Sequence, residues 1–169
     1  MSITRIEFPQ LVRIDPKPEK DVRVQIRKSS VMLKQLGAHI PVFVSLPSAL
    51  KADGNNVKPR LVFGHIDTGA TQTCIDVSLA NEMGLPQIGF SESFTASGKQ
   101  TSPKYAVDLV LPTFDQKLYK NMSICSCQLP YKLEEEPSPR NFGILIGRDL
   151  LSEWVMIWDG ATSSVTISY

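Results

Sequence analysis

Cysteine and histidine are scarce in this sequence, which has three cysteines and two histidines among 169 residues. The odd number of cysteines argues against a disulfide framework, and no Cys-x-x-Cys pair indicates a zinc site. Cys125 and Cys127 are two residues apart and would share one face of a strand. We therefore expect reduced structural thiols, no metal and no cofactor.

The sequence also lacks long apolar runs and an excess of charge of either sign. No stretch approaches the length that crosses a membrane, and no N-terminal segment has the basic start and apolar run of a signal peptide. The formal net charge is +1, and the basic residues near the N-terminus are interspersed with acidic ones, so nothing indicates a nucleic-acid partner. These features predict a cytoplasmic protein that binds neither nucleic acid nor membranes.

What the sequence does contain is a series of short apolar and β-branched segments separated by turn residues. Only two stretches have helical spacing, residues 77–83 after a potential cap at Asp76, and residues 149–154. Residues 1–39 are rich in proline and predict either edge strands or a loosely held extension. We expect an all-β domain over residues 40–169, with strands at residues 40–46, 61–66, 105–112, 118–129, 144–147, 155–158 and 164–169.

Two motifs carry chemical information. The first is Asp67-Thr68-Gly69-Ala70, which follows an apolar strand. The second is Ile144-Leu145-Ile146-Gly147-Arg148-Asp149, about 75 residues later. A bare Asp-Thr-Gly occurs by chance in roughly a few per cent of chains of this length, and Asp and Gly also favour an ordinary β-turn. The turn interpretation requires the second motif to be a coincidence as well.

Together these motifs resemble the retropepsin family of aspartic peptidases, in particular its bacterial and cellular branch. The resemblance covers roughly residues 40–169 and leaves residues 1–39 outside. It implies a single-domain closed β-barrel of the acid protease type with one or two short helices, which assembles as a two-fold homodimer. It also implies an endopeptidase that cleaves an extended peptide or protein substrate.

The residue chemistry agrees with this resemblance. Peptide hydrolysis by carboxylates needs a water molecule between two of them, one acting as base and the other as acid. The sequence has one Asp-Thr-Gly and no Asp-Ser-Gly, so one chain supplies half of such a pair, and Asp67 of a second copy would supply the other. Asp67 is the predicted catalytic residue, with Thr68, Gly69 and Ala70 in support. We also expect residues 164–169 to form an uncovered edge strand that joins the dimer interface.

Three further residues are candidates for substrate binding. Residues 94–105 predict a hairpin, which would be the flap over the substrate, with Gly98 at its tip, although a plain hairpin turn fits equally well. Ile146 would wall a side-chain pocket. His65 either makes a pocket polar or is a structural histidine.

Two points of the second motif stay open. The family usually places an acidic residue soon after Gly-Ala, where this chain has Thr71 and Gln72, so the partner of Arg148 is not apparent. Asp149 is interpreted as a helix N-cap. The alternative to an enzyme is a non-catalytic dimerisation or peptide-binding module that keeps this fold.

Overall fold

The computed structural model describes residues 3–7, 12–13, 25–26, 29–51, 57–95, 98–131 and 141–169. The chain divides into two compact units. One comprises residues 39–153, and the other combines the N-terminal residues up to 38 with residues 154–169. None of the helices in the described ranges is long and apolar enough to cross a membrane.

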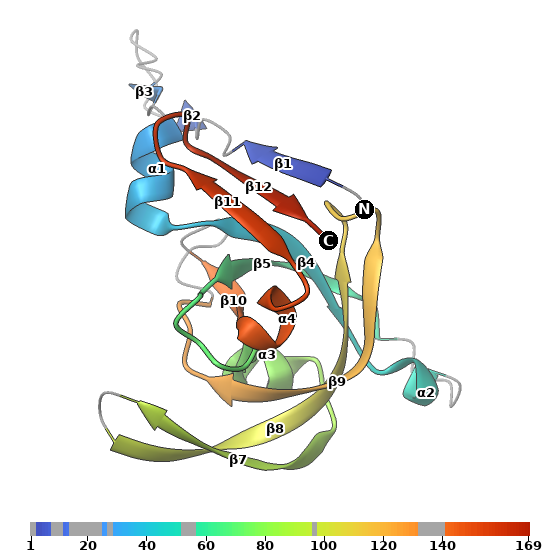
Figure 1. Ribbon diagram of the computed structural model, residues 1–169. Helices are drawn as coiled ribbons and strands as arrows, with labels where there is room; N and C mark the ends of the chain where they lie inside the picture. The colour runs from blue at the N-terminus through green and yellow to red at the C-terminus, as the bar shows by residue number, and fades with distance from the viewer. Residues whose placement is uncertain are drawn as a thin grey trace, which may run out of the picture. The chain divides into compact units, whose positions relative to one another are not determined.

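The larger unit is a closed β-barrel of six strands (Figure 1). The sheet order is β4-β5-β10-β6-β9-β8, and the pairing of β8 with β4 closes it, for example at Val44 and Leu109. The strands are β4 (His39–Ser45), β5 (Arg60–Ile66), β6 (Cys74–Asp76), β8 (Gly98–Leu111), β9 (Lys117–Cys127) and β10 (Phe142–Ile146). The predicted all-β closed barrel is confirmed.

A seventh strand, β7 (Gln87–Thr95), pairs with β8 and with no other strand of the described residues. The predicted hairpin therefore exists, but its first strand begins at Gln87, seven residues before the expected start. Ile88 and Phe90 alternate with polar or small residues as in a strand, but β7 exposes these large apolar side chains instead of burying them.

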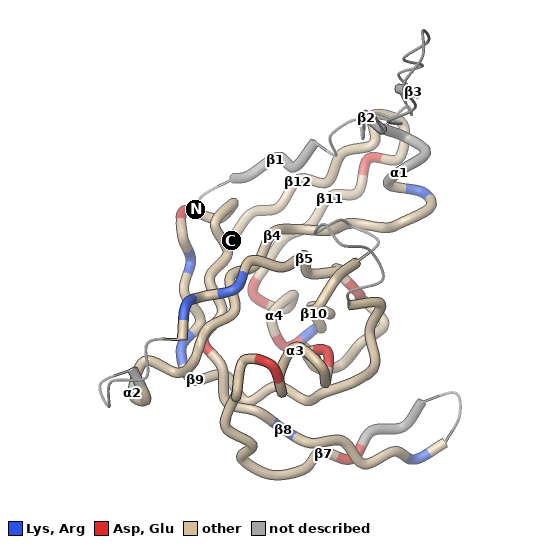
Figure 2. Tube along the Cα trace, turned by 180° about the vertical axis from the view of Figure 1, so that it is seen from behind, with Lys and Arg blue, Asp and Glu red and all other residues tan. Residues whose placement is uncertain are grey.

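The barrel interior is filled by branched aliphatic side chains at alternate positions. In β4 the burial alternates along the strand, as one inward-facing and one outward-facing side require. Burying this apolar surface is the main free-energy term that favours the fold. The fully buried members of this core include Ile40, Val42, Ile75, Val107, Leu109, Leu111, Ile124, Ile144 and Ile146. Positively and negatively charged residues are both distributed along the chain (Figure 2).

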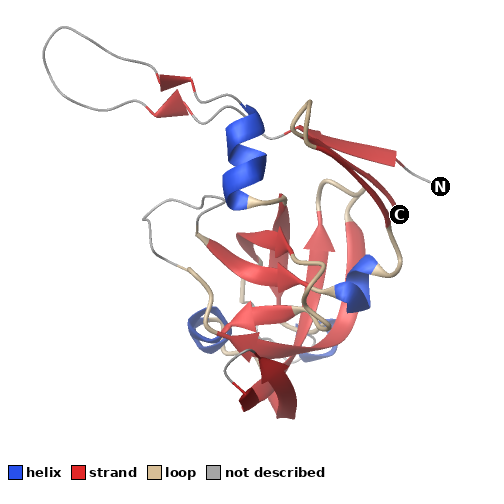
Figure 3. Cartoon of the chain, turned by 60° about the vertical axis from the view of Figure 1, so that its left-hand side comes forward, coloured by secondary structure: helices blue, strands red, loops and turns tan. Residues whose placement is uncertain are grey.

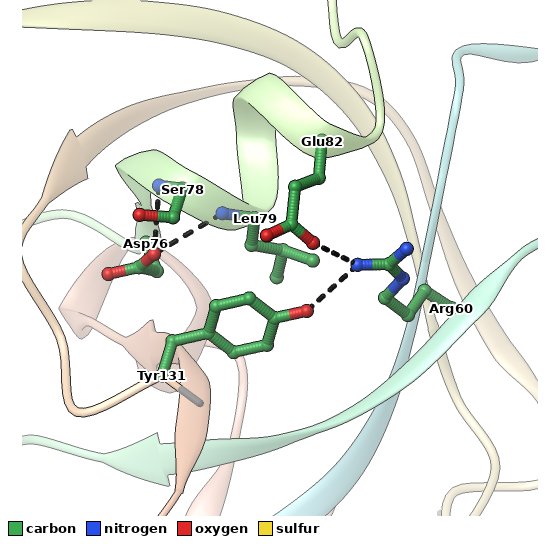
Figure 4. Close-up of polar contacts among 6 residues, drawn as sticks. All are labelled: Arg60, Asp76, Ser78, Leu79, Glu82 and Tyr131. Carbon is green, nitrogen blue, oxygen red and sulfur yellow. Dashed lines mark hydrogen bonds and ion pairs between the residues drawn. The ribbon is translucent and has the colours of Figure 1, made fainter. Parts of the chain in front are cut away.

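The helices of this unit are short (Figure 3): α2 (Ser48–Lys51), α3 (Val77–Glu82) and α4 (Arg148–Leu151). Asp76 caps α3 as predicted, because its carboxylate accepts hydrogen bonds from the N–H groups of Ser78 and Leu79 (Figure 4). The N-cap of α4 is Gly147, and not Asp149 as the sequence suggested. Asp149 lies inside the first turn of α4, and its carboxylate accepts hydrogen bonds from Thr73 instead of capping the helix.

Arg60 connects α3 to two other parts of the barrel unit (Figure 4). Its guanidinium donates hydrogen bonds to the Glu82 carboxylate at 2.6 Å and to the Tyr131 hydroxyl at 2.9 Å. These bonds hold the start of β5 against the helix and against the segment after β9, on residues distinct from the Asp-Thr-Gly motif.

The smaller unit contains α1 (Ser29–Leu36), a two-stranded pair β2 (Val12–Arg13) and β3 (Gln25–Ile26), and a three-stranded sheet. The order of that sheet is β1-β12-β11, with β1 (Ile3–Glu7), β12 (Ser164–Ser168) and β11 (Val155–Asp159). The expectation of an uncovered C-terminal strand is wrong, because β1 and β11 pair with the two edges of β12. N-terminal and C-terminal residues thus share one sheet, a long-range pairing that local sequence patterns do not reveal.

Candidate active site

Asp67 follows directly on the last residue of β5. Strand β5 runs parallel to β10, with Ile66 paired to Ile146, so both strands end at the same edge of the barrel. The N–H of Asp67 donates to the carbonyl of Ile146 at 3.0 Å and extends this pairing by one step. The parallel register therefore brings the two sequence motifs together.

The Asp-Thr-Gly-Ala segment forms a tight turn around the Asp67 side chain. The N–H of Gly69 donates to the Asp67 carboxylate at 2.8 Å, and the N–H of Ala70 donates to the Asp67 carbonyl at 3.2 Å. A Cβ atom on Gly69 would lie 3.0 Å from that carboxylate, so a larger residue here would shift the Asp67 side chain. Asp67 is half-buried, whereas Thr68 and Gly69 are exposed, so the carboxylate is oriented by the turn and accessible from one side.

Arg148 binds the same turn through its side chain and its backbone. Its guanidinium donates to the carbonyl oxygens of Thr68 and Gly69 at 2.8 and 2.9 Å, and to the Thr71 hydroxyl at 2.9 Å. The backbone N–H of Arg148 also donates to the carbonyl of Ala70 at 2.9 Å. The partner of Arg148, which the sequence did not reveal, is therefore mostly backbone carbonyl groups. A guanidinium has several N–H donors in a fork and can bond these acceptors together, whereas a lysine ammonium cannot.

The next residue, Asp149, engages Thr73 at the far end of the loop. Its carboxylate accepts a hydrogen bond from the Thr73 N–H at 2.9 Å and another from the Thr73 hydroxyl at 2.7 Å. That hydroxyl accepts in turn from the N–H of Gly147 at 3.1 Å. Sequence reasoning missed this role of Asp149 and Thr73, although the Gly-Arg-Asp triplet was the signal that could have suggested it.

Gly147 allows the two segments to approach this closely. A Cβ atom at this position would lie 2.4 Å from the backbone carbonyl carbon of Gln72, a separation that no side chain adjustment can relieve. The two motifs thus form one hydrogen-bonded body around Asp67.

The hairpin of β7 and β8 lies near the same loop. The Ser91 hydroxyl on β7 donates to the Gln72 side-chain oxygen at 3.4 Å. Gly98 is the first residue of β8, pairs with Thr95 and has a φ of +108°, a conformation that favours glycine. The two residues between Thr95 and Gly98 lie outside the described part, so the tip itself is not placed.

His65 and Ile146 lie in the paired ends of β5 and β10, next to the turn. Nδ1 of His65 and Nε2 of His39 form a hydrogen bond of 3.0 Å, and both rings contact the Phe142 ring in tilted arrangements. Burial lowers the pKa of His65, and the negative charge of Asp67 opposes this in part. Ile146 is fully buried in the single chain and packs close to Gly64. His65 and His39 thus form a hydrogen-bonded pair, which the sequence did not predict.

The chemistry available at this edge of the barrel is that of one oriented carboxylate. Among the described residues, no group of three or more His, Cys, Asp or Glu side chains gathers as metal ligands would. The carboxylate can act as an acid, a base or a hydrogen-bond acceptor, and a second group must come from elsewhere for paired acid and base catalysis.

No family model and no curated protein matches the sequence. Among solved structures, the chain is similar to a retropepsin-like aspartic protease from Rickettsia conorii, with 20% identity, coverage of 78% of this chain and 81% of that chain, and a TM-score of 0.44. It is similar to the simian foamy virus protease, with 15% identity, coverage of 66% and 91%, and a TM-score of 0.37. A foamy viral protease-reverse transcriptase in complex with an RNA/DNA hybrid is similar at 15% identity, with coverage of 70% and 13% and a TM-score of 0.39. At these identities no residue role is transferred from any of the three.

Proposed function

We propose that this chain is one subunit of an aspartic endopeptidase in which Asp67 is the catalytic carboxylate. The observation that carries the proposal is the turn in which the N–H of Gly69 orients the Asp67 carboxylate while Arg148 donates hydrogen bonds to two carbonyls of the same turn. A rigidly oriented, accessible carboxylate is what water activation requires. The bond from Gly69 alone also forms in an ordinary Asx turn, so the additional bonds from Arg148 to the same turn support the proposal.

The second carboxylate would be Asp67 of another copy of the chain. The sequence supplies a single Asp-Thr-Gly, and a two-fold axis would place identical turns face to face. Two carboxylates that share a site hold one proton between them, because two negative charges at short distance are costly. The ionised member then takes a proton from water while the other protonates the substrate carbonyl oxygen.

The substrate would be an extended peptide bound mainly through its main chain. Strand β7 offers a suitable element, because its second edge is unpaired among the described residues and its side chain at Ser91 touches the loop after Asp67 through Gln72. An extended peptide can add to such an edge as a further strand. Gly98 would give the hairpin the freedom to close over the peptide.

The test is hydrolysis of an unstructured protein such as casein, followed over a range of pH. The wild-type chain should cleave it with a bell-shaped pH dependence, since only the singly protonated pair is active. The variant Asp67→Asn should sediment like the wild type and cleave nothing. Asp115→Asn makes the same chemical change at an exposed turn residue and should cleave normally.

The alternative function, a non-catalytic dimerisation or peptide-binding module, predicts a different pattern. In that case the wild type and Asp67→Asn would be equally inactive on every unstructured substrate while both dimerise. Equal hydrolysis by the wild type and Asp67→Asn would contradict the proposed role of Asp67.

A further inference from the structure

Two cysteines face each other across strands β6 and β9. These strands run parallel, and Cys74 is the direct partner of Cys125 in the register. Their sulfur atoms are 2.7 Å apart, and both cysteines are free thiols. Neighbouring strands are about 4.8 Å apart, within the range of about 4.4–6.8 Å between the Cα atoms of bonded cysteines. The pair therefore meets the positional requirement for a disulfide.

The third cysteine belongs to the same cluster. Cys127 is two residues further along β9, on the same face, and it interacts with the Cys74 thiol. The hydrogen bond with Cys125 lowers the pKa of Cys74. The hydrogen bond with Cys127 and the burial of the thiol both raise it, and together they raise this pKa to about 12. The hydrogen bond to Cys74 and burial raise the pKa of Cys125 as well. The thiols of Cys74 and Cys125 are therefore protonated near neutral pH, and their oxidation is slow.

The two sulfurs also connect to the loop that carries Asp67. Cys74 donates a weak hydrogen bond to the carbonyl of Gln72 at 3.5 Å, and Cys125 donates one to the carbonyl of Thr73 at 3.6 Å. Thr73 is the residue that Asp149 holds. A chemical change at this pair thus acts directly on the end of the loop.

We propose that Cys74 and Cys125 are a redox site that closes reversibly to an intrachain disulfide between β6 and β9. The oxidant is a small disulfide such as oxidised glutathione. The half-exposed Cys74 loses its proton and attacks one sulfur, which forms a mixed disulfide and releases the first glutathione thiol. The buried Cys125 then loses its proton, attacks the Cys74 sulfur and releases the second. The protein loses two electrons and two protons, and the oxidant gains them as two thiols.

The experiment treats the folded full-length chain with oxidised glutathione at mildly alkaline pH, then alkylates the remaining thiols and maps the peptides by mass spectrometry. The wild type should lose two hydrogen atoms, show a peptide that links Cys74 to Cys125, and keep one alkylable thiol at Cys127. Dithiothreitol should restore all three thiols. Cys127→Ser should form the same link, which makes it the matched control.

Cys74→Ser should form no link between the two strands and should stop at a mixed disulfide or remain unreacted. Cys125→Ser should form no link at position 125. Because Cys125 is buried and its variant could fold poorly, the conclusion rests on the wild type and Cys127→Ser. Three alkylable thiols in the wild type after prolonged treatment would overturn the proposal. A link between Cys125 and Cys127, or a link that forms only in denatured protein, would also overturn it. None of these measurements depends on peptidase activity, so the outcome is separate from that of the proposed function.

Discussion

The carboxylate of Asp149 accepts hydrogen bonds from both the backbone N–H and the hydroxyl of Thr73, which precedes it by 76 positions. Thr73 is fully buried, whereas Asp149 is on the surface. The pair joins the end of the loop after Asp67 to the first turn of α4. Charge-assisted bonds of this kind are roughly twice as strong as neutral ones.

Removing this acceptor should destabilise the protein. Asp149→Ala leaves the Thr73 N–H without its acceptor in a buried position, so we expect a loss of about 1–3 kcal/mol in the free energy of unfolding. Asp149→Asn keeps one acceptor oxygen and should lose less. Urea denaturation of the two variants and the wild type measures both changes, and equal stability of Asp149→Ala and wild type would contradict the role of this carboxylate.

A methyl group at Gly147 should be more damaging still. Its Cβ would lie 2.4 Å from the backbone of Gln72, so the two segments around Asp67 must separate. We expect Gly147→Ala to cost about 3 kcal/mol, measured by thermal or urea unfolding. Gly160→Ala is the control, because its Cβ meets nothing closer than 3.7 Å. Two variants of equal stability would mean that the contact is not as tight as described.

Arg148 should affect activity through the orientation of Asp67. A lysine can reach one of the three oxygen atoms that Arg148 contacts, but it cannot bridge them. If Asp67 is catalytic, Arg148→Lys should lower kcat/KM on the order of 10- to 100-fold, since small misplacements of reacting groups are costly. Arg60→Lys, the same change at the Glu82 ion pair, should leave kcat/KM within about twofold of the wild type. Similar losses in both variants would indicate a general effect of arginine replacement.

His65 should make stability depend on pH. The folded pKa of His65 is lowered by burial, so the unfolded chain takes up a proton first as the pH falls below its ordinary value of about 6.5. The unfolded state binds more protons in that range, and the free energy of unfolding should therefore decrease from about pH 7 to pH 5.

His65→Phe keeps a ring beside Phe142 and removes the titrating group. Its unfolding free energy, measured in urea at several pH values, should fall less steeply over the same range than that of the wild type. Identical slopes for the two proteins would show that His65 contributes nothing to the pH dependence.

The proposed dimer should depend on strand β11. This edge strand exposes Val155, Ile157 and Trp158, which are 56%, 61% and 49% accessible. An apolar sheet edge of this kind favours pairing with another chain. We expect Ile157→Lys to weaken self-association at least tenfold, because a charge in an apolar contact costs about 1.4 kcal/mol or more.

Sedimentation velocity over a concentration series measures this change. Leu118→Lys, at an exposed leucine on β9, is the matched control and should associate like the wild type. If Ile157→Lys dimerises as tightly as the wild type, β11 is not part of the interface and other elements form the dimer surface.

Local chemistry made several features predictable from the sequence. Alternating apolar residues give the strands of the barrel, since one face must be buried. Asp76 caps α3 because its side chain reaches N–H groups two and three residues away. The Asp-Thr-Gly-Ala segment contains within itself the contact from Gly69 to Asp67. All of these depend on neighbours in the chain, which a sequence displays directly.

Other features were decided by the tertiary structure alone. The bonds from Arg148 to the Asp67 turn, from Asp149 to Thr73 and between Cys74 and Cys125 span from 51 to 80 positions. They exist because β5 lies parallel to β10, and β6 parallel to β9, in one particular register. The pairing of β12 with β1 and β11 likewise reversed the expectation of a free C-terminal edge. The sequence by itself determined which residues can turn, cap and bury, whereas register and closure are set by the joint burial of all the strands, which no local pattern encodes.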